Sequence, residues 1–162
     1  MKKSSPSAKS PDTATVVLRQ FRVVFNAVRT HFRQMEKDTG LGGAQVWALS
    51  LVHRTPGIGV GDIALGMEIH QSTASNLVKV LLKKELISMT KSAVDKRVVE
   101  LRVTTTGKAA LKTIPGPFEG VLPDALRQLD EATLASLHHD LEKLVKVLAA
   151  DEDAGSIPLA HL

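Results

Sequence analysis

Residues 60–104 read VGDIALGMEIHQSTASNLVKVLLKKELISMTKSAVDKRVVELRVT, and this stretch decides the fold. Two helices are expected, over residues 62–67 and 71–84, with a tight connection at 68–70 between them. Two helices with this spacing form a helix-turn-helix, whose second helix enters the DNA major groove by its N-terminal residues. The helices are predicted from apolar residues at helical spacing, which are Ile63, Ala64 and Met67 in the first and Leu77, Val80 and Leu81 in the second.

The opposite face of the second helix carries polar side chains. It begins with small or polar hydrogen-bonding residues, which match the donors and acceptors on base edges. It ends in Lys79, Lys83 and Lys84, and lysines suit phosphates, which position a helix without reading the sequence. From this helix we predict the DNA-binding residues Gln71, Ser72, Thr73, Ser75, Asn76, Lys79 and Lys83.

A β-hairpin is expected after the second helix, with strands at 86–91 and 97–103 and a polar tip at 92–96. Apolar and polar residues alternate along the second strand, so one face can be buried and the other wet. A helix-turn-helix followed by a hairpin is a winged helix. The side chains at a hairpin tip project beyond the body, and we predict DNA contacts from Lys91, Asp95, Lys96 and Arg97.

Arg97 is expected to enter a minor groove, where narrow A·T stretches attract a guanidinium group. Asp95, two residues away, is expected to orient it. The alternative is an exposed salt bridge within the wing, worth about 0–1 kcal/mol to folding and nothing to function.

Three segments in this order resemble the multiple antibiotic resistance regulator (MarR) family of bacterial transcription factors. They are STASNLVKVLLKKELI at 72–87, the Asp95-x-Arg97 wing motif, and LRVTTTGKAAL at 101–111, which contains Thr104-x-x-Gly107. The resemblance extends over residues 16–148. It implies a winged helix-turn-helix flanked by dimerisation helices, mainly α with a small β-hairpin. The chain departs from the family at Glu68 and Glu85, where glycine is usual, and at His70, where a Ser or Thr helix cap is usual.

The domain organisation follows from composition and the resemblance. Residues 1–10 are expected to be a disordered basic tail, and residues 11–150 a single domain of this type. Within it, the winged helix spans about 44–106, and the dimerisation helices about 11–38 and 107–149. Residues 151–162, acidic and then mixed, are expected to be a loose tail or one that lies along a partner.

The flanking helices carry long apolar stripes. The last one, expected over 131–149 with Asp130 as N-cap, has leucines at spacings of three and four, the pattern of one helix packed on another. Pro115-Gly116-Pro117 predicts a break before it, with helix resuming near Pro117 and an irregularity at Pro123. Thr105 or Thr106 is expected to cap the helix before the break. The stripes are Val17, Phe21, Val24, Val28, Phe32 and Met35 in the first helix and Leu134, Leu137, Leu141, Leu144 and Leu148 in the last.

Charge is distributed unevenly along the 162 residues. Residues 1–54 carry a net charge of +6 and residues 55–108 of +3, whereas residues 119–162 carry −6. The first two thirds can therefore face a polyanion. The chain has no cysteine, which excludes disulfides and thiolate chemistry. No apolar run reaches the ~18 residues of a membrane span, so we expect a cytoplasmic protein with no membrane partner.

The leading hypothesis is a homodimeric regulator, a repressor that binds a pseudo-palindromic operator in double-stranded DNA and is released by a small molecule. Relatives often bind small aromatic effectors in a cleft between the dimerisation and DNA-binding parts, which His31 and Trp47 would line here. The alternative is a winged-helix protein-interaction module without DNA contact, which would expose apolar residues on the second helix. We find no nucleophile with a base, no metal ligand set and no cofactor loop, so we expect neither an enzyme nor a cofactor.

Overall fold

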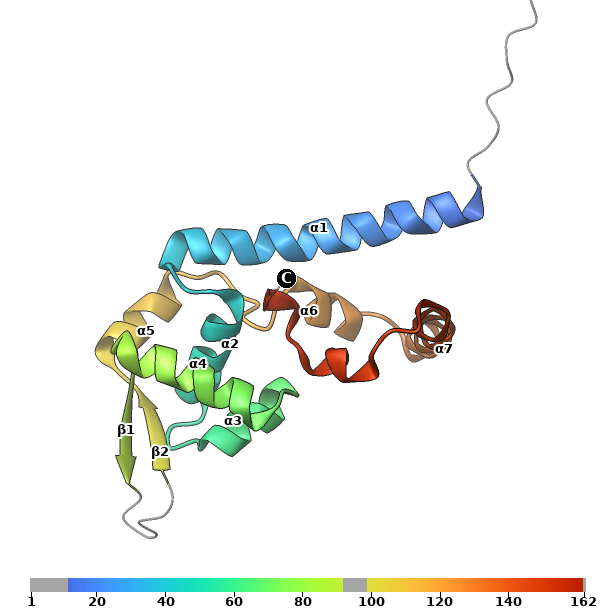
Figure 1. Cartoon of the computed structure of the whole chain (residues 1–162). Coiled ribbons are helices and arrows are strands. Elements are labelled where there is room, and N and C mark those ends of the chain that lie inside the picture. The colour runs from blue at the N-terminus through green and yellow to red at the C-terminus, as the bar shows by residue number, and fades with distance from the viewer. Residues whose placement is uncertain (1–11, 92–98, 162) are drawn as a thin grey trace, which may run out of the picture.

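The computed structural model describes residues 12–91 and 99–161, apart from the side chains of Glu152 and His161. It confirms a mainly α fold with a small two-stranded antiparallel hairpin (Figure 1). The helices are α1 (Thr13–Thr39), α2 (Gly43–Arg54), α3 (Val60–Met67), α4 (Gln71–Lys83), α5 (Thr105–Lys112), α6 (Val121–Arg127) and α7 (Glu131–Leu148), and the strands are β1 (Ile87–Lys91) and β2 (Val99–Val103).

The helix-turn-helix lies where the sequence predicted it, with one difference at its start. Helix α3 begins at Val60, two residues earlier than expected. The backbone N–H of Gly59 donates to Oδ2 of Asp62 at 3.1 Å, which satisfies a donor at the helix start and extends the helix back into the expected loop. Helix α4 begins at Gln71 as expected, and its residues Leu77 and Leu81 are buried.

Strands β1 and β2 pair antiparallel, with Ile87 opposite Val103 and Lys91 opposite Val99. The alternation expected in β2 is present, since Leu101 is fully buried and Arg102 is exposed. Ile58, in the loop before α3, forms an isolated bridge with Leu101. The loop therefore pairs with β2 at one residue and holds the hairpin against the helix-turn-helix.

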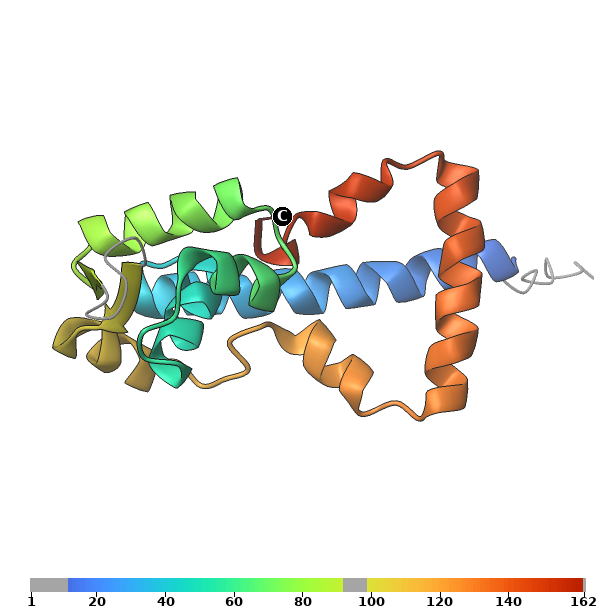
Figure 2. The same ribbon diagram turned by 90° about the horizontal axis from the view of Figure 1, so that it is seen from below.

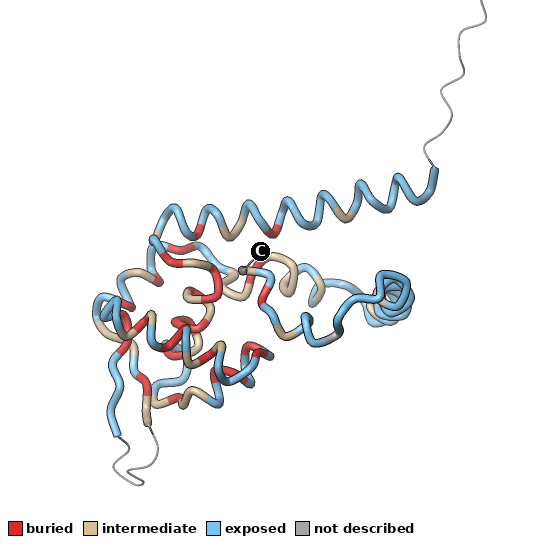
Figure 3. The backbone as a smooth tube through the Cα atoms, viewed as in Figure 1, coloured by how far each residue is buried: buried red, intermediate tan, exposed pale blue. Residues whose placement is uncertain are grey.

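The hydrophobic core lies in the winged-helix part of the chain. Leu49, Ile63, Leu81 and Leu101 are fully buried and come from α2, α3, α4 and β2. Burying each of these side chains contributes about 1.5–3 kcal/mol. Figure 3 shows the buried residues gathered in these elements, while most of α1 and all of α7 remain at the surface.

Two expectations about the helices after the wing are wrong in detail. The cap of α5 is Thr104, not Thr105 or Thr106, because its Oγ1 accepts from Gly107 N at 3.0 Å. The predicted break after this helix is present, but helix resumes at Val121, not near Pro117. Pro123 causes no break, since it lies in the first turn of α6, where a backbone N–H has no partner within the helix.

Helix α7 has the expected N-cap. Oδ1 of Asp130 accepts from Thr133 N at 2.9 Å and its Oδ2 accepts from the Thr133 hydroxyl at 2.6 Å. These two hydrogen bonds hold the pKa of Asp130 below its ordinary value of 3.8, and the bond from the Thr133 hydroxyl has the larger effect.

Residues 151–161 are not the loose tail that we expected. They form two short 3-10 helices, η1 (Glu152–Ser156) and η2 (Leu159–His161). The chain leaves the end of α7 and returns towards the middle of α1, where η2 packs against α1 and α2 (Figure 2). The apolar residues Ile157, Pro158, Leu159 and Ala160, which follow the acidic part of the segment, account for this return.

Candidate DNA interface and the adjoining cleft

Helix α4 is sharply two-sided. Its inner face buries Ala74, Leu77, Val78 and Leu81 against the core. Its outer face exposes Gln71, Ser72, Asn76, Lys79 and Lys83, all of them polar or cationic. Ser72, Asn76, Lys79 and Lys83 follow one another at spacings of four, three and four, so they form a single line along the helix.

Two other predicted residues of α4 are placed less openly. Thr73 and Ser75 are half-buried. The Ser75 hydroxyl donates to the carbonyl oxygen of Gln71, four residues earlier, at 2.8 Å. This bond uses the only donor of the hydroxyl, which leaves its lone pairs as acceptors for a base or water.

We expected Lys84, like Lys79 and Lys83, to face phosphates, but in the structure it contacts the end of α1 instead. Its Nζ donates to the carbonyl oxygen of Gly40 at 3.1 Å, at the end of α1. A cation at a helix C-terminus is favourable, because the last carbonyls carry partial negative charge. Lys84 therefore ties α4 to α1. The sequence did not show this, because the two residues are 44 positions apart.

The turns on both sides of α4 contain left-handed residues. Glu68, at the end of α3, has φ 54°, and Glu85, just after α4, has φ 56°. These are the two positions at which the resemblance predicted glycine. The N-cap of α4, His70, accepts no side-chain hydrogen bond. Glycine would adopt these two left-handed conformations more easily than glutamate does. Each glutamate therefore costs the fold roughly 1 kcal/mol in the turns that flank α4.

The wing is described up to its tip. Lys91, the last residue of β1, is exposed. Asp95, Lys96 and Arg97 lie outside the described residues, so the wing contacts stay predictions from the sequence. In β2, Arg102 pairs with Glu100 at 3.2 Å.

An apolar cleft adjoins α1 and α2. One cavity of about 160 Å³ has Trp47 in its wall, together with Val28 and Phe32 of α1 and Met67–Ile69 of the helix-turn-helix. The buried indole Nε1 of Trp47 has no hydrogen-bond partner among the described residues. His31 is placed differently. Its Nε2 lies 3.0 Å from the carbonyl oxygen of Pro117, and its ring packs edge-on against Phe32.

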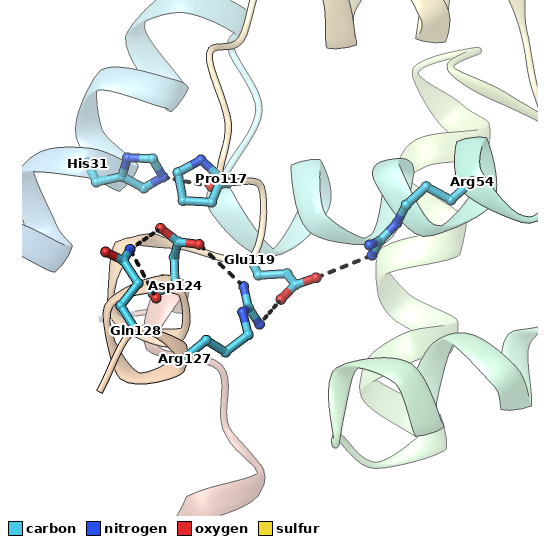
Figure 4. Close-up of polar contacts among 7 residues, drawn as sticks. All are labelled: His31, Arg54, Pro117, Glu119, Asp124, Arg127 and Gln128. Atoms are coloured by element: carbon cyan, nitrogen blue, oxygen red, sulfur yellow. Dashed lines mark hydrogen bonds and ion pairs between the residues drawn. The ribbon is translucent and has the colours of Figure 1, made fainter. Parts of the chain in front are cut away.

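A chain of ion pairs joins α2 to α6 across the break (Figure 4). Glu119 accepts from Arg54 at 3.3 Å through one carboxylate oxygen and from Arg127 at 2.9 Å through the other. Both arginines are more than half exposed, so each pair contributes at most about 1 kcal/mol. The value of the network is geometric, since it fixes the end of α2 relative to α6.

Within the described part of the chain, no three His, Asp or Glu residues are grouped so that they could hold a metal ion. Of the helices described, none is both long and apolar enough to cross a membrane.

Comparison with known proteins agrees with this architecture. Residues 39–98 match the family model described as MarR family. The chain is 23% identical over 131 residues to the HTH-type transcriptional repressor MdtR of Bacillus subtilis (strain 168), covering 81% of this chain and 84% of MdtR.

Two solved structures share the fold over most of the chain. The S. aureus MepR–DNA complex has a TM-score of 0.56 at 22% identity, covering 85% of this chain and 99% of MepR. A MepR-like protein complexed with pseudoligands has a TM-score of 0.56 at 19% identity, covering 84% of this chain and 95% of that protein. The winged-helix segment thus matches the MarR family model, and the chain as a whole shares its fold with these regulators.

Proposed function

We propose that the protein is a homodimeric, sequence-specific DNA-binding repressor that a small molecule releases from its operator. One observation carries the DNA-binding part of this proposal. The outer face of α4 exposes Gln71, Ser72, Asn76, Lys79 and Lys83, and no large apolar side chain of α4 is exposed. A winged helix that docked onto protein instead would be expected to present apolar residues on this face.

The chemistry of this face divides along the helix. Asn76 presents an amide, which pairs with adenine through two hydrogen bonds in the major groove. Lys79 and Lys83 follow on the same line and suit backbone phosphates. Gln71 and Ser72 begin the helix, where a recognition helix points into the groove.

The dimer is supported by apolar surface that the described chain leaves open. Helix α7 buries none of its residues, and its seam leucines Leu137, Leu141 and Leu144 are each more than a third exposed. The first turns of α1 expose Val16, Val17 and Leu18 to a similar extent. Exposed apolar residues of this kind on two helices support an interaction site, and a second copy of the chain can cover them through a self-complementary two-fold contact.

Release by a small molecule rests on the cleft. Trp47 is in its wall, and the relative complexed with pseudoligands shares the fold. His31, which we expected in the same wall, instead holds the connector at Pro117 against α1. We therefore propose Trp47 as an effector contact and His31 as the residue that positions the cleft's edge.

Binding to the DNA upstream of the protein's own coding sequence tests the central part of this proposal. A labelled duplex of that region should bind in a salt-dependent manner, because phosphate contacts release counterions. A scrambled duplex of the same composition should bind at least 10³-fold more weakly. Equal affinity for both duplexes would leave only non-specific binding and contradict the proposal.

A further inference from the structure

The segment after α7 occupies the cleft next to α1. Pro158 is buried, and Ala160 packs on the core beside Phe32. The contact with α2 is close, since a Cβ built on Gly43 would lie 2.9 Å from Cβ of Ala160. Figures 1 and 2 show this segment returning from α7 to the middle of α1.

The same segment separates two hollows. Residues 155–160 form one wall of the cavity of about 160 Å³ that contains Trp47. Leu159 and Ala160 also line a second, open hollow of about 480 Å³ between α1 and the start of α2. Val28 and Phe32 border both spaces. Removal of residues 155–160 would therefore join the two hollows into one cleft along α1, apolar at Val28 and Phe32 and charged at Arg29, Arg33 and Glu36.

Nothing polar anchors this segment to the body in the part of the chain that the structure describes. Its hydrogen bonds are internal: the Ser156 hydroxyl donates to Asp153 O at 2.8 Å, and Asp153 N donates to Oδ1 of Asp151 at 3.0 Å. Apolar contact alone holds the segment in place, and Ile157 remains more than half exposed. A segment held in this way can leave without stranding a buried polar group.

The turn before α4 also lines the smaller cavity. Met67, Glu68 and Ile69 line it together with residues 155–160. Glu68 is the left-handed residue of that turn. A change of occupant in this cavity therefore acts on the backbone that sets the direction of α4.

We propose that residues 155–160 are an intramolecular plug of the effector cleft, and that a small molecule binds by displacing them. The proposal rests on the function proposed above. It adds that residues 155–160 and the effector compete for the same cleft. While the plug is seated, it supports the Met67–Ile69 turn. When a ligand replaces it, that support changes, and the recognition helix is released from its DNA-binding position.

The lining of the smaller cavity indicates the chemistry of the ligand. Its walls are apolar apart from Glu68, Glu119 and Ser156, and it contains no Lys, Arg or His. Glu119 is already paired with Arg54 and Arg127. The smaller cavity therefore offers no cation to a carboxylate, whereas the second hollow is also lined by Arg29, Arg33 and Glu36. The ligand class is an aromatic molecule whose apolar ring system occupies the smaller cavity.

Two variants of the full-length chain, each replacing one alanine by aspartate, test the plug. Ala160→Asp places a charge against Phe32 and Gly43 and should unseat the segment. Ala154→Asp is the matched control, because Ala154 is exposed and lines neither hollow. The probe is N-phenyl-1-naphthylamine, a neutral aromatic fluorophore, and energy transfer from Trp47, the chain's one tryptophan, reports its binding.

The expected result is that Ala160→Asp binds the probe roughly tenfold more tightly than the parent, as follows if the plug is seated about nine tenths of the time. Ala154→Asp should bind like the parent. Equal affinity in all three proteins, or no binding to any of them, would overturn the proposal.

Hydrogen–deuterium exchange on the unaltered protein gives a second readout that needs no variant. Probe binding should speed exchange of the amides of Ile157, Leu159 and Ala160 and slow that of neighbouring amides in α1 and α2. If the probe binds and exchange at 157–160 stays the same or slows, the segment is not displaced and the plug is excluded. Operator binding, measured separately on the parent, decides whether the proposed repressor function stands.

Discussion

The ring of Phe32 occupies the space that a side chain on Gly43 would need. A Cβ built on Gly43 would lie 2.6 Å from Cε1 of Phe32, and one built on Gly120, on another side of the ring, would lie 2.8 Å from its Cζ. The two glycines thus let one aromatic residue of α1 approach both α2 and the start of α6. This contact joins α1 to the start of α2 and to the start of α6.

Gly43→Ala should lower the free energy of unfolding by about 1–3 kcal/mol, because an added methyl group overpacks a filled site. Gly61→Ala is the matched control. Gly61 is helical, and its Cβ would meet nothing within 4 Å, so alanine there should be neutral or stabilise by up to about 1 kcal/mol. Urea denaturation of both variants measures the difference. An unchanged midpoint for Gly43→Ala would show that Phe32 yields at little cost.

The turn before α4 gives a prediction of opposite sign. Glu68→Gly should raise stability by up to about 1 kcal/mol, because glycine adopts φ 54° without the steric cost of a Cβ. Glu142→Gly, in the exposed middle of α7, should lower it by about the same amount. Thermal unfolding compares the two, and destabilisation by Glu68→Gly would mean that the glutamate side chain supports the turn.

The helix-turn-helix and the hairpin were predictable because their signals are local. Apolar spacing located α4 to within one residue at each end, and alternation identified Leu101 as the buried face of β2. The two left-handed glutamates were found by comparison with a family pattern, since nothing in their own side chains indicates φ. The Asp130 cap followed from residue type and position alone.

The features missed depend on contacts between distant residues. Lys84 looks like its neighbour Lys83, and only the fold brings its Nζ to Gly40. The cap at Thr104 was misplaced by one or two residues because three consecutive threonines offer the same hydroxyl. The acidic start of residues 151–161 indicates a loose tail, but Pro158 and Ala160 pack into a cleft that α1, α2 and α6 create together.

Substitutions on the outer face of α4 should distinguish residues that contact bases from residues that contact phosphates. Asn76→Ala should weaken operator binding by about 1–3 kcal/mol, because a base-edge contact is lost. It should also reduce the difference in affinity between the operator and a scrambled duplex. Lys83→Ala should weaken binding to both duplexes alike and reduce the salt slope by about one.

Lys143→Ala serves as the control for Lys83→Ala, since Lys143 is an exposed lysine on α7 that pairs only locally with Asp140. It should leave affinity and salt slope unchanged. A Lys83→Ala variant that behaves like Lys143→Ala would remove Lys83 from the interface. Asn76→Ala with full specificity would shift base reading to Gln71 and Ser72.

The seam of α7 should hold the dimer together. Leu141→Glu places a charge in the middle of the exposed leucines and should produce a monomer at micromolar concentration in sedimentation experiments. Val147→Glu, at a position 83% exposed and off the seam, should remain dimeric. A parent protein that sediments as a monomer would contradict the two-fold assembly directly.

Methylation protection of the upstream DNA tests the central claim, that paired α4 helices read a two-fold operator, most directly. We expect two protected patches of guanine N7 in the major groove, about 10 base pairs apart or a multiple of that spacing, related by two-fold symmetry. Both patches should weaken together with Asn76→Ala. Protection at one asymmetric half-site, or no protection at protein concentrations that saturate the labelled duplex, would contradict the claim.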